Sequence, residues 1–220
     1  MPLFKTKTNH KPKNSVYNLM KRLLIIILFG WLAQSCISAR INSHQMVQQP
    51  ERFNQLLLLV TDSDNVFYEW NEDNYNAVLL GQFNSMDGFD LRKRIHNQLQ
   101  MHLNTVKIIP ADQKFDIHKL VSMDEFILNI NDLEYDGILL VHTRALWRED
   151  VVINGDSYSN PRSEFHVFLM DKDLFEKQYM AKMSVDGSAI NSFNNLFSRF
   201  SRELAKDLSN KGFILRPAVL

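Results

Sequence analysis

The residue types that could perform chemistry are spread along this sequence, and none of them has the spacing of a known metal or cofactor site. Residues 62–65 (Asp-Ser-Asp-Asn) begin as a calcium-binding loop does, but Phe67 occupies the sixth position, where such a loop needs glycine, and Asp73 occupies the twelfth, where a glutamate usually stands. His96 and His102 are six residues apart, so on a helix they do not share a face as a metal-binding pair would. We therefore expect no bound metal and no cofactor.

His142 has the most suggestive position among the remaining candidates, because it follows the apolar segment 138–141, which we expect to be a buried strand. The carboxyl ends of strands are where α/β proteins often place their site residues. A hydrolase or glycan-binding enzyme with a site near His142 and Asp171 is therefore the alternative function. However, a histidine at the end of a strand more commonly makes a structural hydrogen bond, and no serine lies in a Gly-x-Ser-x-Gly turn. We expect no catalytic residues.

Aromatic and acidic side chains are interleaved between residues 66 and 75. Aromatic rings beside carboxylates and amides can stack on sugar rings or bury the side chain of a partner. The same rings can instead pack against the protein's own domain, and the sequence leaves both interpretations open. The candidate contacts to a partner or a glycan are Phe67, Tyr68, Trp70 and Tyr75.

The 220-residue chain contains 25 basic and 25 acidic residues, but the two signs are unevenly distributed. Residues 1–35 contain six of the basic residues and no acidic one, which leaves 19 basic against 25 acidic residues in the remainder. An acidic body does not suit a nucleic-acid-binding protein, which needs clustered positive charge to neutralise phosphates. The single cysteine excludes an internal disulfide and a multi-cysteine zinc site.

The amino-terminal segment has the pattern of a secretion signal. Lys21-Arg22 precede an apolar run at residues 23–33, which ends at Gln34-Ser35-Cys36. This run is shorter than the roughly 20 apolar residues of a membrane-spanning helix, and its length is typical of the apolar core of a signal peptide. We expect residues 1–35 to be a signal peptide, with Met20 as an alternative start of translation.

Residues 32–36 (Leu-Ala-Gln-Ser-Cys) resemble a bacterial lipobox, with the small residues Ala33 and Ser35 at the third and first positions before the cysteine. The resemblance implies cleavage between Ser35 and Cys36 and attachment of a diacylglyceryl group and an acyl chain, such as palmitate, to Cys36. Several acyl chains hold a protein on a membrane far more firmly than one chain does. Ile37 stands where lipoproteins retained in the inner membrane of enteric bacteria carry aspartate, so the outer membrane is the expected location, in either leaflet. An ordinary signal cleavage and an uncleaved anchor helix are the alternatives for this segment.

Behind the signal we expect a lipidated flexible tether at residues 36–52, one α/β (α+β) domain at residues 53–215 and a tail at residues 216–220. The expected strands are residues 56–60, 77–83, 105–109, 138–141, 165–170 and 179–185, the last two forming a hairpin. Turns are expected at Asn154-Gly155-Asp156 and Asp186-Gly187-Ser188. The expected helices are residues 89–104 capped by Asp87, a helix behind the capping box Ser122–Glu125, and residues 191–210 followed by Gly212. This order predicts a single mixed sheet with about three amphipathic helices mainly on one face.

The order of elements is similar to that of small envelope lipoproteins related to the curli-secretion lipoprotein and the peptidoglycan-synthase activator, with Tyr135–Val141 and Phe165–Asp171 carrying the likeness. The resemblance covers residues 53–214 and implies a domain that binds other envelope proteins and performs no chemistry. The sequence therefore predicts a lipid-anchored, non-catalytic envelope lipoprotein that binds other envelope proteins or cell-wall components. The enzymatic alternative near His142 would then be an envelope hydrolase or glycan-binding enzyme.

Overall fold

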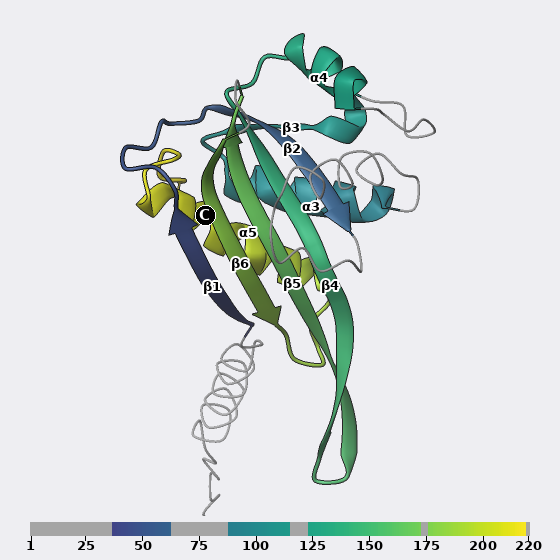
Figure 1. The fold of residues 1–220 in the computed structure, drawn as a ribbon. Helices are drawn as coiled ribbons and strands as arrows, with labels where there is room; N and C mark the ends of the chain where they lie inside the picture. Colours follow the sequence, from purple (N-terminus) through teal and green to yellow (C-terminus); the bar gives the residue numbers. More distant parts are fainter. Residues whose placement is uncertain (1–36, 63–87, 115–122, 173–175, 219–220) are drawn as a thin grey trace, which may run out of the picture. The chain divides into compact units, whose positions relative to one another are not determined.

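The computed structural model describes residues 37–62, 88–114, 123–172 and 176–218 of the chain. Its strands form one sheet in the order β1-β6-β5-β4-β2-β3 (Figure 1). β2 is parallel to both β3 and β4, and the other neighbouring pairs are antiparallel. The predicted mixed sheet of an α+β fold is therefore confirmed. The strands are β1 (Ser38–Gln45), β2 (Gln55–Asp62), β3 (Lys107–Pro110), β4 (Gly137–Ile153), β5 (Asp156–Asp171) and β6 (Lys177–Asp186).

The helices pack unevenly on the two faces of the sheet, as predicted. The described helices are α3 (Phe89–His102), α4 (Met123–Asn131), α5 (Phe193–Asn210) and the short 3-10 helix η1 (Ala111–Gln113). α3 and α5 supply side chains to the larger apolar cluster, whereas α4 contributes Ile130 to a smaller cluster on the opposite face. In the part of the chain that the structure describes, no helix is both long enough and apolar enough to span a membrane.

The larger cluster is held together by the apolar stripe of α5. Phe165 of β5 and Phe200 of α5 are both fully buried, and their ring centroids lie 4.1 Å apart. Burying an aromatic side chain of this size contributes on the order of 2 to 3 kcal/mol. The α5 residues in the cluster are Leu196, Phe197, Phe200, Leu204, Ala205 and Leu208. This stripe recurs at intervals of three and four residues, which is why the sequence predicts the helix correctly.

Both ends of α5 are closed by side-chain and backbone hydrogen bonds. At the start, the Ser192 hydroxyl accepts from the Asn195 backbone N–H, and the Asn195 side chain accepts from the Ser192 backbone N–H. At the end, Gly212 has φ +85°, and the Phe213 N–H donates to the Leu208 carbonyl at 3.0 Å. This is the glycine-terminated cap predicted at Gly212. The predicted caps Asp87 and Ser122, and the predicted strand 77–83, lie outside the described residues.

The prediction of a flexible tether at residues 36–52 is wrong for residues 38–45. These residues form β1, which pairs antiparallel with β6 from Ser38 opposite Asp186 to Gln45 opposite Tyr179. Ile37 and Ala39 are partly buried against the larger cluster. A polar edge strand has a weak sequence signal because only a few of its side chains reach the core, and its stability comes from backbone pairing with a neighbour distant in sequence.

The strands β4 and β5 extend much further than the predicted segments 138–141 and 165–170. β4 continues to Ile153, and β5 begins at Asp156 after a two-residue turn. Asn154 and Gly155 have φ values of +54° and +89°, as a tight hairpin turn requires, so the turn predicted here is confirmed. Residues 147–153 and 156–160 were missed because none of their side chains is buried, and the alternation of apolar and polar residues is therefore lost there.

Candidate functional site

Most of the residues proposed as sites from the sequence lie outside the described part of the chain. The predicted cleavage and lipid-attachment positions, Ser35 and Cys36, precede its first residue. The aromatic candidates Phe67, Tyr68, Trp70 and Tyr75 lie in the undescribed segment 63–87. These assignments stay predictions.

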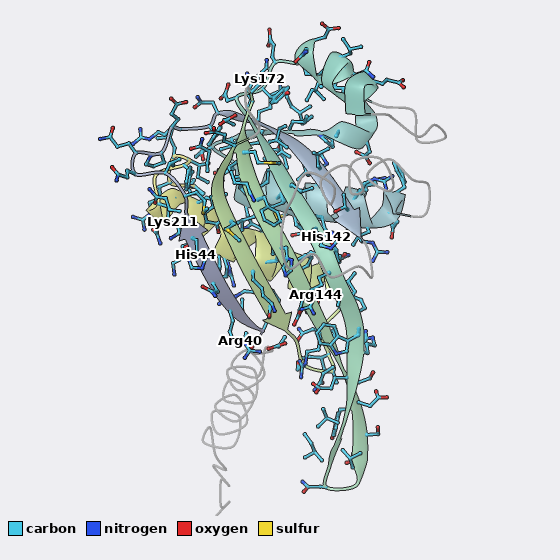
Figure 2. The ribbon with its side chains drawn as sticks, viewed as in Figure 1. Arg40, His44, His142, Arg144, Lys172 and Lys211 are labelled. Atoms are coloured by element: carbon cyan, nitrogen blue, oxygen red, sulfur yellow. The ribbon has the colours of Figure 1, made fainter. Side chains whose placement is uncertain are left out.

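His142 and Asp171 do not form a common site. The pairing of β4 with β5 places His142 opposite His166 and Asp171 opposite Gly137. The two candidates are thus separated by five residue positions along the strands, about 16 Å at the usual rise of a strand. Figure 2 shows Lys172, which follows Asp171, at the top of the view, whereas His142 lies part-way down the strands. Acid and base partners must lie within hydrogen-bond reach of one substrate, so a hydrolase acting through this pair is excluded.

His142 itself has the structural role considered in the sequence analysis. Its side chain is 1 % exposed, and its Nδ1 lies 3.0 Å from the hydroxyl oxygen of Thr61 on the neighbouring strand β2. The ring of His166 lies next to it, with centroids 6.2 Å apart. Burial lowers the pKa of His166, and the positive charges of Arg144 and Lys182 lower it further. The structure shows no group of three or more metal-ligating side chains among the residues it describes.

A line of alternating charges crosses four strands close to the start of β1. Arg40 of β1 pairs with Asp186 of β6 at 3.2 Å, and Asp186 also faces Arg162 of β5 at 3.7 Å. Arg162 in turn donates to the Glu149 carboxylate of β4 at 2.7 and 2.9 Å. These partners all lie on one face of the sheet, since each strand alternates its side chains and paired residues share a face. The line of charges connects the edge strand to the part of the hairpin that leaves the sheet.

The β4–β5 hairpin then continues past the other described strands. Residues 148–153 and 156–161 pair with each other and with no other strand of the described residues, and we call this part the hairpin arm. Six residues on each side make it about 20 Å long. Figure 1 shows the arm extending past the ends of β1 and β6. The arm carries apolar side chains that are largely exposed: Val152 is 70 %, Ile153 53 % and Tyr158 40 % exposed.

Contacts at the base of the arm fix its direction relative to the sheet and to α5. The guanidinium carbon of Arg148 lies 5.6 Å from the ring centroid of Phe193 at the start of α5, and its Nη1 donates to the Ser159 carbonyl at 2.9 Å. Arg162 also donates to the Gly187 carbonyl at 2.7 Å. A two-stranded ribbon by itself is marginally stable in water, so these contacts and the tight turn are what keep the arm ordered.

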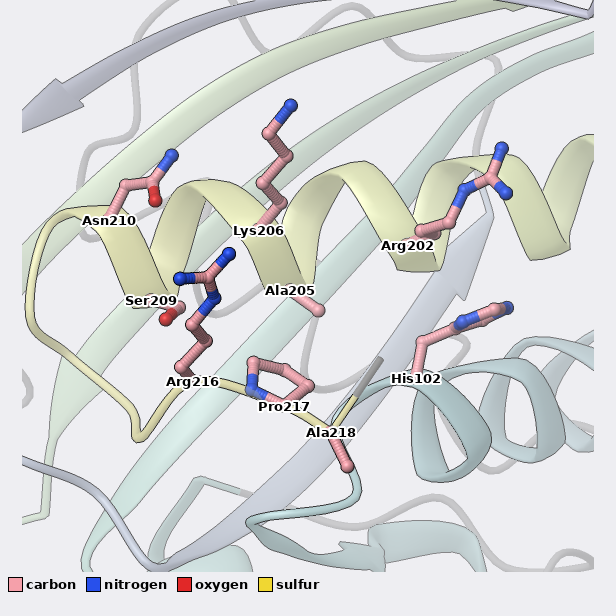
Figure 3. Close-up of a pocket in the computed structure, with 9 residues that line it drawn as sticks. All are labelled: His102, Arg202, Ala205, Lys206, Ser209, Asn210, Arg216, Pro217 and Ala218. Atoms are coloured by element: carbon pink, nitrogen blue, oxygen red, sulfur yellow. The ribbon is translucent and has the colours of Figure 1, made fainter. Parts of the chain in front are cut away.

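A second surface feature is a cavity of about 350 Å³ at the other end of α5, which we call the basic pocket. Its lining comes from α5, from the end of α3 and from the segment that follows α5 (Figure 3). The lining residues are His102, Arg202, Ala205, Lys206, Ser209, Asn210, Arg216, Pro217 and Ala218. Sequence reasoning missed this site, although the spacing of Arg202 and Lys206, four residues apart on a predicted helix, places both on one face.

Known proteins resemble this chain in the path of the backbone and not in sequence. No protein-family model matches the chain. No curated protein is similar to it in sequence. Solved structures similar to this chain include the PelC dodecamer from Paraburkholderia phytofirmans, at 8 % sequence identity and a TM-score of 0.47, covering 78 % of this chain and 97 % of PelC. Lipoprotein GNA1162 from Neisseria meningitidis is similar at 11 % identity and a TM-score of 0.38, covering 71 % of this chain and 98 % of that protein.

Proposed function

We propose that this protein is a bacterial envelope lipoprotein, held at the outer membrane by lipid on Cys36, whose domain binds another envelope protein through the hairpin arm and catalyses nothing. The lipid anchor is supported by the lipobox-like residues 32–36 and by the position of the chain's single cysteine. The binding role is supported by the exposed apolar side chains of the hairpin arm.

The observation that carries the proposal is that the hairpin arm leaves the sheet at the end where β1 begins, at Ser38. Strand pairing aligns Ser38 with Asp186, Asp186 with Arg162, and Arg162 with Trp147. Cys36 precedes Ser38, the first residue of β1, by two residues in the sequence. The arm leaves the sheet from the same row. A lipid on Cys36 would therefore attach the domain to the membrane through the start of β1, the row from which the arm leaves the sheet.

The composition of the arm favours a protein as its partner. Val152 and Ile153 are adjacent in sequence and point to opposite sides of the ribbon, and Tyr158 shares a side with Ile153. At the tip of the arm, neither side is covered by another described element of the fold. Fully burying an exposed valine or isoleucine contributes roughly 1.5 to 3 kcal/mol, so a partner that encloses the tip of the arm gains a substantial binding energy.

The anchor is tested by the mass of the amino-terminal peptide of protein extracted from native membranes. We expect a peptide that begins at Cys36 and carries the mass of a diacylglyceryl group and an acyl chain. Cys36→Ser is the control, because serine supplies no thiol for the lipid, and its peptide must lack the added mass. An unmodified peptide beginning at residue 36, or a chain that retains residues 23–33, would show that the protein is not a lipoprotein.

The role of the hairpin arm is tested separately by chemical cross-linking in intact envelopes. Val152→Ser with Ile153→Ser is expected to abolish a cross-linked species that the wild-type chain forms, while changing the free energy of unfolding by less than about 0.5 kcal/mol because both residues are exposed. The matched control is Leu128→Ser with Ile190→Ser, which removes two side chains that are 69 % and 76 % exposed elsewhere on the domain. Equal cross-linking by the two double variants would contradict a binding role of the arm.

A further inference from the structure

The basic pocket is built by segments that are fixed to one another. Arg202, Lys206 and Asn210 occupy one face of α5 at intervals of four residues. The segment after α5 folds back across it, because Phe213 and Ile214 are buried and the Thr105 hydroxyl donates to the Leu215 carbonyl at 2.9 Å. These contacts hold the opposite wall of the pocket at a set distance from α5.

The charged side chains that line the pocket are all cationic. Arg202 and Lys206 extend from α5, and Figure 3 shows Arg216 pointing from the chain segment after α5 back toward that helix. No carboxylate of the described residues lines the cavity. His102 completes the lining beside Arg202, with its Nε2 2.9 Å from the Ser198 hydroxyl. Like charges around one cavity repel each other, and an anion placed between them relieves that repulsion.

The acidic residues of α5 are engaged elsewhere and do not neutralise the pocket. Glu203 pairs with Arg199 at 3.1 Å, and Asp207 accepts a hydrogen bond from the Tyr179 hydroxyl at 2.8 Å. Among the described residues, Arg202, Lys206 and Arg216 form no ion pair. Neither acid of α5 therefore neutralises Arg202 or Lys206, which line the cavity, because both acids have other partners.

We propose that the basic pocket binds the anionic oxygens of a small ligand, in the form of a phosphate or a carboxylate group. Two arginines supply planar forks of donors that match both groups, and Lys206 adds a compact charge. The volume of about 350 Å³ exceeds that of a single ion and lies at the lower end of the range for small-molecule sites. The apolar surfaces of Ala205 and Pro217 suit the remainder of a molecule the size of a sugar.

This site is independent of the proposed binding role of the hairpin arm. The arm is held at the start of α5, through Phe193, whereas Ser209 of the basic pocket is 16 residues further along the helix. That spacing corresponds to about 24 Å. A failure of the arm to bind a partner therefore has no bearing on the pocket, and each can be tested with the other intact.

The proposal is tested by calorimetric titration of the full chain, in an uncharged detergent at low ionic strength, with inorganic phosphate, glucuronate and glucose. We expect phosphate or glucuronate to bind and neutral glucose not to bind. Arg202→Gln with Arg216→Gln is expected to weaken that binding at least about ten-fold, since each arginine supplies charge-assisted hydrogen bonds. The matched control is Lys93→Gln with Lys182→Gln, which removes the same charge from exposed positions outside the pocket and should change the affinity less than about two-fold.

The ring of His102 provides a second readout that reports on the pocket directly. Burial lowers the pKa of His102, and the charge of Arg202 lowers it further. A bound anion would offset the charge of Arg202, so we expect phosphate or glucuronate to raise this pKa in a histidine NMR titration. The proposal is overturned if neither anion binds, if the two double variants lose affinity equally, or if binding leaves the His102 titration unchanged.

Discussion

Gly137→Ala is expected to lower the free energy of unfolding by about 3 kcal/mol, because the first residue of β4 has no room for a side chain. A Cβ atom at this position would lie 2.6 Å from Cδ1 of Phe53 and 2.8 Å from the carbonyl oxygen of Met170. Phe53 is buried, and its backbone N–H donates to the Phe213 carbonyl at 2.8 Å, so the ring cannot move away freely. The Met170 carbonyl belongs to the neighbouring strand β5 and is equally constrained.

The measurement is urea denaturation of the full chain in detergent, followed by circular dichroism. Gly155→Ala is the control, because a Cβ there meets nothing within 4 Å and is opposed only by the φ of +89°. We expect this control variant to have a free energy of unfolding about 1 kcal/mol lower than wild type. Adding Phe53→Leu to Gly137→Ala should recover part of the loss, as expected for residues in contact. A loss at Gly137 no larger than that at Gly155 would show that the close approach to Phe53 is not a constraint.

Raising the pH above about 10 is expected to destabilise the wild-type domain through Tyr179. Burial, reinforced by the charge of Asp207 and by the hydrogen bond to it, raises the pKa of Tyr179 far above its ordinary value. In the unfolded chain the same phenol ionises near its ordinary value, so above that pH only the unfolded state releases the proton. The contribution of Tyr179 to the free energy of unfolding is thus fully present below about pH 10. Above that pH it decreases by about 1.4 kcal/mol per pH unit.

The comparison that isolates this effect is Tyr179→Phe, which removes the titrating group and leaves Asp207 without its donor. At neutral pH we expect this variant to be less stable by about 1 to 2 kcal/mol. Above pH ~10, where the phenol of the unfolded wild-type chain ionises, its stability should decrease less steeply than that of wild type. Tyr158→Phe, at a position 40 % exposed on the hairpin arm, is the control for loss of a tyrosine hydroxyl and should change the free energy of unfolding at neutral pH by less than about 0.5 kcal/mol. Parallel profiles of wild type and Tyr179→Phe would contradict the role of Tyr179.

The sequence by itself determined those parts of the fold whose information is local. The stripe of apolar residues on α5, the glycine at 212 and the Asn154-Gly155 turn were each predicted at their positions, because helix periodicity and positive φ depend on neighbouring residues. The lipobox-like residues 32–36 are also a local pattern, and the prediction of a lipid on Cys36 rests on them alone.

Only the tertiary structure decided how segments far apart in the chain meet. The pairing of β1 with β6 joins Arg40 to Asp186, 146 residues away, and converts an expected tether into an edge strand. The register of β4 and β5 separates His142 from Asp171, although both had seemed to be candidates for one site. The basic pocket likewise needs the hydrogen bond from Thr105 to Leu215, 110 residues apart. Such contacts depend on the burial of distant apolar surfaces against each other, and no local pattern of residues records which distant partner completes them.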